Sequence, residues 1–364
     1  MLAANGDDRM NASDFCASRQ RIFHMPFIVT TEPAEVGGQT ETITVLTDWA
    51  ETVRAEVWPS HGFNCLRWQV RQTSGEWGEL LYCDPSWETS PVPTRSGHPI
   101  LFPFPNRMKD GHFMHAGREY LLPRNETSGT HSIHGFSPRN RWRIVGSGTT
   151  AEHAWVRGEF RLSLDAPASL LHWPTDFLLQ VTYRLHADRL AVDVSIHNPN
   201  LTVALPFGLG FHPYFTCPNA PGANVDDMIL MSTARKIWNT LEGIPTGTIS
   251  PIPTGFDFTE PHRIETTQFD TLFTDLGVPA EGGRQVVAEL RHSSAPGYLS
   301  IHMPADFREL MLYTPPHRKA LAIEPYTCAT DAANLVDRGI DSGWRNLAPG
   351  GTFETSVEYV WHAE

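Results

Sequence analysis

The strongest constraint on the fold is an alternation of apolar and polar residues with a period of two. It is clearest in residues 179–196, where the apolar positions are Leu179, Val181, Tyr183, Leu185, Leu190, Val192, Val194 and Ile196. Successive side chains of a strand point to opposite faces, so this pattern predicts an antiparallel hairpin with one buried and one solvated face. Residues 353–361 repeat the pattern near the C-terminus.

The rest of the chain also favours strands. Further extended candidates are Ile43–Leu46, Arg54–Trp58, Cys65–Val70, Val286–His292, Tyr298–His302 and Glu309–Tyr313. Only Asp331–Asp337 suggests a short helix, and 29 prolines and 28 glycines are spread along the chain as turn residues. We therefore predict an all-β fold, a large antiparallel β-sandwich with very few short helices. Without a break in composition, we expect one domain over residues 26–364 and a flexible tail over residues 1–25.

Charge and cysteine content exclude several classes of function. The formal net charge is -13 and no lysine- or arginine-rich run occurs, which argues against nucleic acid and anionic membranes as partners. No segment approaches the ~20 apolar residues of a membrane span, and the N-terminus does not resemble a signal peptide. The five cysteines are scattered without a CxxC pair. We expect reduced thiols, a cytoplasmic location, and a monomer or homodimer.

One histidine stands in an unusual apolar frame. His212 lies in the stretch Leu205-Pro-Phe-Gly-Leu-Gly-Phe-His-Pro-Tyr-Phe215. Gly208 and Gly210 suggest a close approach of backbone to another group, and Pro213 favours an extended conformation at His212. Such a frame would hold an imidazole at a set angle. The alternative is a core histidine bonded to a carbonyl group.

Two earlier stretches hold candidate binding residues. The proline-rich run Gly97–Arg107 cannot be a central strand, so we expect a rigid loop that presents Arg107 to hydroxyl or carboxylate groups. An exposed turn arginine is the alternative. Residues 111–117 suggest a tight hairpin. In Ser132-Ile-His-Gly135, the glycine after His134 again implies close backbone approach.

Metal and nucleophile chemistry find little support in the sequence. His131, His134 and His212 could in principle bind zinc, but their spacing matches no zinc motif, and we predict no metal. No GxSxG elbow, phosphate-binding loop or dinucleotide fingerprint occurs.

Two acidic residues remain as candidates. Asp270 lies among Phe269 and Phe273, where a carboxylate needs partners such as ligand hydroxyls, unless it is a plain turn aspartate. Glu324 ends the apolar run Ala320–Ile323 and is followed by Pro325. A buried glutamate is costly unless it is bonded or functional, so Glu324 is the best candidate for a general base.

Taken in order, these motifs resemble the aldose 1-epimerase (galactose mutarotase) family. The matching segments run from about residue 40 to the C-terminus, and they are Pro105-Asn-Arg107, Gly111-His-Phe113, Ser132-Ile-His-Gly135, Gly210-Phe-His-Pro-Tyr-Phe215, Phe269-Asp270, Ile323-Glu-Pro325, Asp331-Ala and Asn334-Leu335. The resemblance implies a galactose mutarotase-like supersandwich with a sugar cleft across one sheet.

The resemblance also implies roles for single residues. Glu324 matches the family's general base and His212 its general acid, while Arg107, His134 and Asp270 match residues that bind the sugar. The implied reaction interconverts the α and β anomers of an aldohexose by ring opening and reclosure. It needs no redox change, so no cofactor is expected. The phenylalanine and proline on either side of His212, and Pro325-Tyr326 after Glu324, indicate a divergent branch.

Other readings stay open at this point. A hexose 6-phosphate could be the substrate, although only Arg139 and Arg141 form an arginine pair near a candidate motif. A sugar-binding or sensor protein without turnover could share the fold. A glycosidase would need two carboxylates, for which Glu324 and Asp270 are the only candidates.

Overall fold

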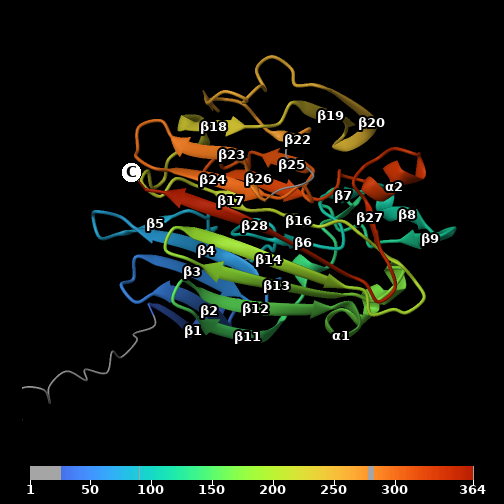
Figure 1. The fold of residues 1–364 in the computed structure, drawn as a ribbon, viewed down its shortest axis with the longest axis horizontal. Coiled ribbons are helices and arrows are strands. Elements are labelled where there is room, and N and C mark those ends of the chain that lie inside the picture. The colour runs from blue at the N-terminus through green and yellow to red at the C-terminus, as the bar shows by residue number, and fades with distance from the viewer. Residues whose placement is uncertain (1–25, 90, 278–282, 364) are drawn as a thin grey trace, which may run out of the picture.

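The computed structural model describes residues 26–89, 91–277 and 283–363, so the predicted tail over residues 1–25 lies outside the described residues. Within these ranges the largest unit is a nine-stranded antiparallel sheet, seen across the front of the molecule in Figure 1. Its strands, in spatial order, are β11 (Arg143–Thr149), β12 (Ala154–Arg161), β13 (Leu178–Leu185), β14 (Arg189–His197), β28 (Thr352–His362), β24 (Tyr298–Met303), β23 (Gln285–His292), β18 (Met228–Ser232) and β21 (His262–Arg263).

Two further sheets pack against this one. The five-stranded sheet runs β1 (Phe27–Val36), β2 (Gln39–Asp48), β3 (Val53–Trp58), β4 (Asn64–Arg71) and β5 (Trp77–Glu79). The eight-stranded sheet runs β20 (Ile244–Pro251), β19 (Lys236–Leu241), β22 (Asp270–Thr274), β25 (Glu309–Tyr313), β26 (Leu321–Tyr326), β16 (Gly210–Phe211) and β6 (Ile100–Leu101), with β17 (Tyr214–Phe215) also paired to β26. Isolated bridges at Cys65–His98 and Leu81–Phe215 connect the two, so that together they form one layer facing the nine-stranded sheet.

Short elements connect the sheets. The two-stranded pairs are β7 (Arg107–Met108) with β10 (Ser132–Ile133), β8 (His112–His115) with β9 (Arg118–Leu121), and β15 (Leu205–Phe207) with β27 (Arg345–Leu347). The helical elements are α1 (Leu162–Asp165), α2 (Ala332–Asp337), η1 (Lys109–Gly111), η2 (Ser137–Arg139), η3 (Pro167–His172) and η4 (Val225–Asp227). Among the described residues, no helix has the length and apolar character needed to cross a membrane.

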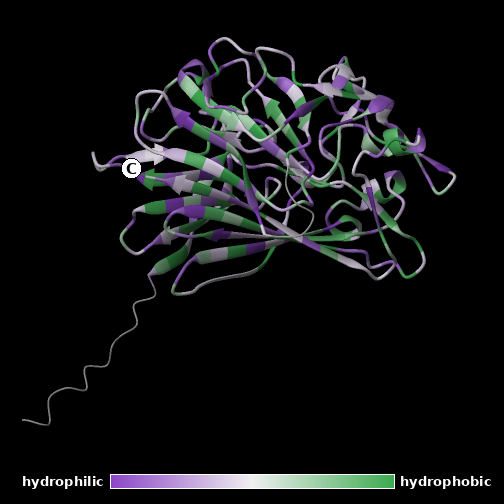
Figure 2. Ribbon diagram, turned by 45° about the horizontal axis from the view of Figure 1, so that its top comes forward, coloured by the Kyte–Doolittle hydropathy of each residue, from purple (hydrophilic) through white to green (hydrophobic). Residues whose placement is uncertain are grey.

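The period-two predictions are confirmed. The predicted hairpin is β13 and β14, in which Leu179 pairs with Ile196 and Leu185 with Leu190. The C-terminal pattern is β28, which pairs with β14 and β24 in the middle of the nine-stranded sheet. Figure 2 shows hydrophilic and hydrophobic residues alternating along several strands. The six shorter extended candidates all lie in strands, and the single predicted helix is α2. The all-β fold class is therefore correct.

The proline-rich run from Gly97 to Arg107 behaves as expected. Apart from the edge strand β6 and the start of β7, it is an irregular segment, with a cis peptide bond between Phe102 and Pro103. The segment passes through the core, where His98 is fully buried between the layers. The ring nitrogens of His98 bond the hydroxyls of Tyr183 (3.0 Å) and Tyr359 (2.9 Å). These bonds tie the segment that precedes Arg107 to the nine-stranded sheet.

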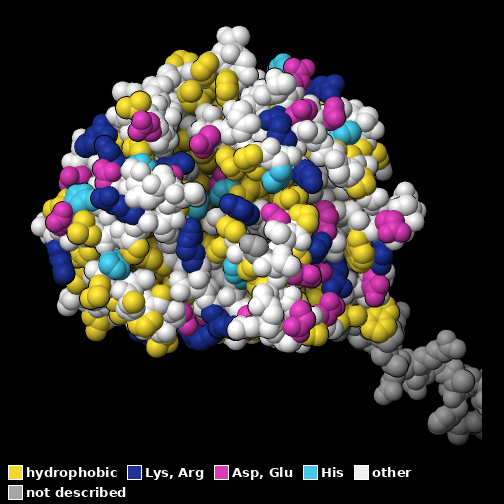
Figure 3. Space-filling model, turned by 180° about the vertical axis from the view of Figure 1, so that it is seen from behind, with side chains coloured by type: hydrophobic (Ala, Val, Ile, Leu, Met, Phe, Trp, Pro, Cys, Tyr) yellow, Lys and Arg dark blue, Asp and Glu magenta, His cyan; other side chains and the backbone are white. Residues whose placement is uncertain are grey.

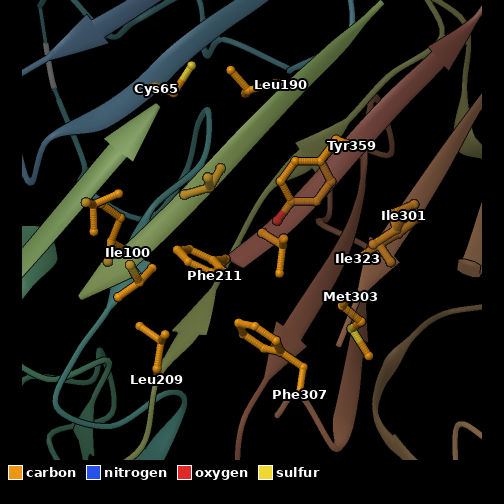
Figure 4. Close-up of a cluster of buried hydrophobic side chains, with 14 of the residues drawn as sticks. Cys65, Ile100, Leu190, Leu209, Phe211, Ile301, Met303, Phe307, Ile323 and Tyr359 are labelled. Atoms are coloured by element: carbon orange, nitrogen blue, oxygen red, sulfur yellow. The ribbon is translucent and has the colours of Figure 1, made fainter. Parts of the chain in front are cut away.

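The main core lies between the layers. Figure 4 shows part of it, where Phe211, Ile323 and Phe307 belong to one cluster with Tyr359 and Ile301 of the nine-stranded sheet. Each of these side chains is essentially inaccessible to solvent. Because side chains alternate along a strand, the residues next to Phe211 and Ile323 point to the opposite face of the eight-stranded sheet. Those residues are His212 and Glu324.

Candidate active site

A polar cleft of about 410 Å³ opens on the face of the eight-stranded sheet that points away from the core. Figure 3 shows this side of the molecule, which is hollowed near its middle and has histidine, basic and acidic side chains around the hollow. Strands β22, β25 and β26 form the floor, and the loops before β7 and β10 form one wall. The lining residues are Thr94, Arg95, Asn106, Arg107, Glu126, Thr127, Ser128, Ile133, His134, His212, Tyr214, Asp270, Met311, Tyr313 and Glu324.

All five residues singled out from the sequence lie in this cleft: Arg107, His134, His212, Asp270 and Glu324. They come from five separate segments spread over more than half of the chain. The sheet pairing brings them together, since β26 pairs with β25 on one side and with β16 and β17 on the other, and β22 pairs with β25.

Glu324 and His212 form the centre of the cleft. His212 Nε2 lies 3.3 Å from Glu324 Oε1, and the two side chains are only 8% and 1% exposed. Burial raises the pKa of Glu324 well above its ordinary value, and it lowers the pKa of His212 to about 3. Both groups are therefore driven toward their neutral forms. Such a pair can exchange one proton between its facing atoms and with a bound hydroxyl group.

The second oxygen of Glu324 has a partner of its own. The Tyr326 hydroxyl donates to Glu324 Oε2 at 2.5 Å, and both residues are fully buried. Tyr326 and Glu324 are two positions apart on β26, so both point to the cleft face. The ring of Tyr326 lies against Gly210, where an added Cβ would come within 2.5 Å of Tyr326 Cδ1. The predicted close approach at this glycine is confirmed.

Tyr214 supports the imidazole of His212. The two rings stack with centroids 4.6 Å apart. The Tyr214 hydroxyl donates to the Thr94 carbonyl at 2.6 Å, and its oxygen lies 3.4 Å from His212 Nε2. The backbone amide of His212 donates to the carbonyl of Pro99 at 2.9 Å. The ring is thus held by contacts from two sides.

His134 approaches from the opposite wall. Its ring centroid lies 5.5 Å from that of His212. The backbone amide of Asn106 donates to His134 Nδ1 at 3.2 Å, so the neutral ring carries its proton on Nε2 and can donate it to a ligand. Burial, with smaller effects from His212 and two arginines, lowers the pKa of His134 well below its ordinary value. His134 is therefore a neutral hydrogen-bond donor.

The glycine after His134 has the predicted role. Gly135 has a φ of +67°, and a Cβ added to it would lie 2.2 Å from the carbonyl oxygen of Phe102. His134 itself has a φ of 66°, a conformation that is uncommon for residues other than glycine. Close packing of this turn against the proline-rich segment sets the position of the His134 ring.

Arg107 is held in place by acidic and amide groups. Its Nε donates to Glu126 Oε1 at 2.6 Å, and its Nη1 donates to Asn106 Oδ1 at 3.2 Å. Although partial burial raises the pKa of Glu126, hydrogen bonds from Arg107 and Ser128 bring it below its ordinary value. The backbone is held as well, because the Asp331 amide donates to the Arg107 carbonyl at 2.9 Å. Arg107 is a fixed donor at the cleft and not an exposed turn arginine.

Asp270 differs from its expected surroundings. Phe269 and Phe273 belong to the main core, but Asp270 is exposed at the start of β22, so the flanking rings do not enclose its carboxylate. In the sheet it lies opposite Tyr313, which also lines the cleft. An exposed carboxylate at this edge can accept hydrogen bonds from hydroxyl groups.

Two alternative sites, a three-ligand metal site and an arginine pair at the cleft, are not found among the described residues. Within the described ranges, no group of three or more His, Cys, Asp or Glu side chains is arranged to hold a metal ion. His131 instead accepts from the backbone amide of Asp110 at 3.0 Å. Arg141 forms an ion pair with Glu41 at 3.4 Å, and neither it nor Arg139 lines the cleft.

Sequence reasoning did not assign roles to several cleft residues. Glu126 lies in a loop without a recognisable motif, and nothing in its local sequence indicates that it pairs with Arg107. Asn106 directly precedes Arg107, and Tyr326 follows two residues after Glu324, so the alternation along β26 could have placed Tyr326 beside Glu324. Tyr214 stands in the same motif as His212, whereas Arg95 and Tyr313 are brought to the cleft by tertiary structure alone.

Comparisons with known proteins agree with this fold. The uncharacterized protein YihR of Escherichia coli strain K12 is 29% identical over 246 residues, which is 66% of this chain and 72% of YihR. A galactose mutarotase-like protein of Clostridium acetobutylicum has a similar structure, with a TM-score of 0.78 and 20% identity over 92% of this chain and 99% of the other. Galactose 1-epimerase of Lactobacillus acidophilus superposes with a TM-score of 0.69 and 16% identity, over 92% and 99% of the two chains.

A family-level match completes the comparison. The model of the aldose 1-epimerase family matches residues 47–360, a range that contains all five candidate residues and the three sheets apart from β1, most of β2 and the end of β28. The resemblance noted in the sequence is thus confirmed, and a carbohydrate epimerase type of function follows from it. The chain belongs to the aldose 1-epimerase family.

Proposed function

We propose that this protein is an aldose 1-epimerase that interconverts the α and β anomers of an aldohexose. The observation that supports this most directly is the buried pair of Glu324 Oε1 and His212 Nε2, 3.3 Å apart on the floor of a polar cleft. In this proposal Glu324 is the general base and His212 the general acid. Free thiols at Cys65, Cys83, Cys217 and Cys328 are consistent with the cytoplasmic location that we infer.

The reaction needs one proton acceptor and one proton donor. Glu324 takes the proton from the hydroxyl on C1, and the electrons of that O–H bond form the C1 carbonyl. The bond between C1 and the ring oxygen breaks, and the ring oxygen takes a proton from His212. After rotation about C1–C2, the same steps run in reverse on the other face of the carbonyl and give the other anomer.

The protonation state of the Glu324–His212 pair suits this reaction cycle. With both groups neutral, one proton lies on Glu324, and moving it to His212 gives the carboxylate and the imidazolium without exchange with solvent. Arg107 contributes a nearby positive charge that favours the carboxylate. The active form therefore contains one proton in the pair, and we expect turnover to be roughly constant near neutral pH.

Three side chains are proposed to bind the sugar. His134 presents an Nε2–H donor, Arg107 a fixed guanidinium, and Asp270 an exposed carboxylate at the edge of the floor. Two donors and one acceptor around an acid–base pair suit a ligand that has hydroxyl groups on most of its carbons.

One observation favours a second candidate substrate, an aldohexose with an anionic substituent such as a 6-phosphate. Arg95 lines the cleft, and no hydrogen bond or ion pair of its guanidinium is found among the described residues. The positive charge of Arg107, in contrast, is compensated by Glu126. An arginine at the rim whose guanidinium has no hydrogen-bonded or ion-paired partner among the described residues could bind an anionic group of the sugar.

Polarimetry tests the proposal. Freshly dissolved α-D-glucose, α-D-galactose and α-D-glucose 6-phosphate are each followed with wild type and with Glu324→Gln. We expect accelerated mutarotation of at least one sugar, and a loss of several powers of ten in the variant. Sugar binding by the wild type without any acceleration would indicate a sensor and refute the enzyme. Wild-type turnover in Glu324→Gln would refute the assigned base.

A further inference from the structure

The proposed base has a hydrogen-bond partner that the proposed reaction does not use. The Tyr326 hydroxyl donates to Glu324 Oε2 at 2.5 Å. The ring of Tyr326 cannot move far, because it lies between the backbone of Gly210 and the rest of the buried floor. Glu324 therefore has one oxygen bonded within the protein and one, Oε1, that faces His212.

Asn106 determines the direction of this hydrogen bond. Asn106 Oδ1 accepts from the backbone amide of Arg107 at 2.9 Å and from Arg107 Nη1 at 3.2 Å. The side chain of Asn106 also faces the Tyr326 hydroxyl, where it opposes the rise in the pKa of Tyr326 that burial causes. Since Oδ1 is occupied by two donors, the amide nitrogen is the group that faces Tyr326. With a donor group on that side, the single proton of the hydroxyl goes to Glu324 Oε2.

The backbone of Asn106 suits this position. Its φ is 53°, in the left-handed region that asparagine tolerates better than most residues. Its backbone amide donates to His134 Nδ1. One buried asparagine thus contacts Arg107, His134 and Tyr326 together.

We propose that Tyr326 is a positioning residue for the general base: its hydroxyl, oriented by Asn106, occupies Glu324 Oε2 and leaves Oε1 as the oxygen that takes the proton of the sugar. The inference rests on the proposed function of Glu324. Burial raises the pKa of Glu324, whereas the hydrogen bond that Tyr326 donates to its carboxylate lowers that pKa. Tyr326 therefore increases the fraction of Glu324 that is ionised.

Other groups also act on Glu324 from the surrounding elements. Arg107 favours the ionised form, whereas Asp270 on β22 opposes it. His212 lies beside Oε1, and Met311, the neighbour on β25, is apolar. Tyr214 and Tyr313 are further hydroxyl groups of the cleft. Among the described residues, the Tyr326 hydroxyl is the only group with a recorded hydrogen bond to Glu324 Oε2.

The first test is Tyr326→Phe, which removes the hydroxyl and keeps the ring. We expect kcat for mutarotation to fall about tenfold or more with little change in KM, since a hydrogen bond to a charged group is lost. The titration of Glu324 should move to higher pH by about one unit. It is followed by infrared difference spectroscopy, using the carboxylic acid C=O band that is absent from Glu324→Gln.

The matched control is Tyr359→Phe. Tyr359 is equally buried, and its hydroxyl bonds His98 in the core away from the cleft. The control should lose stability but leave the Glu324 band unchanged. If Tyr326→Phe behaves as Tyr359→Phe does, with no movement of the band, the hydroxyl is merely structural and the proposal is wrong.

A second variant keeps the test decisive if Tyr326→Phe does not fold. Asn106→Asp replaces the amide donor by an acceptor, so the Tyr326 proton gains a competing partner and a negative charge is added. The Glu324 band should again titrate at higher pH, and an unchanged midpoint would overturn the inference. The pH midpoint of the Glu324 band can be measured without turnover. Absence of wild-type mutarotation would therefore refute the proposed function, while the band would still decide whether Tyr326 controls Glu324.

Discussion

A second buried glutamate, Glu309 on β25, allows a quantitative prediction about stability. Glu309 is fully buried, and its Oε2 accepts from Trp238 Nε1 at 3.0 Å, whereas Oε1 has no partner among the described residues. Burial raises its pKa to about 7, despite opposing hydrogen bonds from Thr274 and Trp238. In the unfolded chain the value is about 4.5. Folding therefore favours the protonated form.

The sign and size of the effect follow from linkage. Between about pH 4.5 and pH 7 the folded protein binds a proton at Glu309 that the unfolded chain has released, so the free energy of unfolding falls as the pH rises. A difference of about 2.5 pH units, at about 1.4 kcal/mol each, gives about 3 kcal/mol. This contribution is fully present below about pH 4.5 and lost above about pH 7.

Glu309→Gln tests this reasoning because glutamine has the same shape, can accept from Trp238 and cannot ionise. The free energy of unfolding of the variant relative to wild type should rise by about 3 kcal/mol between pH 4.5 and pH 8.5, measured by urea titration. With about 0.7 kcal/mol/K for the unfolding entropy of a chain of this size, the midpoint temperature should rise by about 4 °C. The exposed Glu152→Gln serves as control. A stability difference that stays constant with pH would refute the reasoning.

Three further predictions follow from the site. Gly135→Ala should destabilise the protein by more than about 1 kcal/mol and weaken sugar binding, because its Cβ would collide with the Phe102 carbonyl. Urea unfolding measures the loss of stability, and KM measures the loss of binding. An unchanged KM would show that this turn does not set the position of His134. Glu126→Gln should raise KM about threefold to tenfold with little change in kcat, since Arg107 loses its charged partner; an equal loss in kcat would contradict a binding role. Glu324→Gln, which we expect to be inactive, should have a higher melting temperature than wild type at alkaline pH but not at acidic pH, since the raised pKa of Glu324 makes its contribution to stability decline as the pH rises; a difference that does not change with pH would be inconsistent with this.

The direction of the key side chains could be predicted from the sequence. Phe211 and Ile323 are apolar and point into the core, so His212 and Glu324, the next residues along, point the other way. The close approaches at Gly210 and Gly135 were also expected from sequence. These features are local, because side-chain direction in a strand and the space around a glycine depend on a few neighbouring residues.

The environment of each side chain was less predictable. Asp270 has two aromatic neighbours in sequence, yet it is exposed, because the alternation along β22 turns those rings into the core. The sequence around Glu126 did not indicate a role in the cleft, although its carboxylate forms an ion pair with Arg107. Both outcomes depend on which segment packs next to which, and a single sequence does not show that for a sheet built from distant strands.

The sequence by itself determined the all-β class, the hairpin of β13 and β14, and the residue types that we propose for acid–base chemistry on a sugar. Tertiary structure decided that β26 lies between β25 and β16, which brings Glu324 to 3.3 Å from His212, and that the Tyr326 hydroxyl donates to Glu324 Oε2. The physical reason is the range of the interactions. Alternation is set within a strand, whereas strand order, burial and the resulting pKa values arise from contacts between segments that are far apart in the chain.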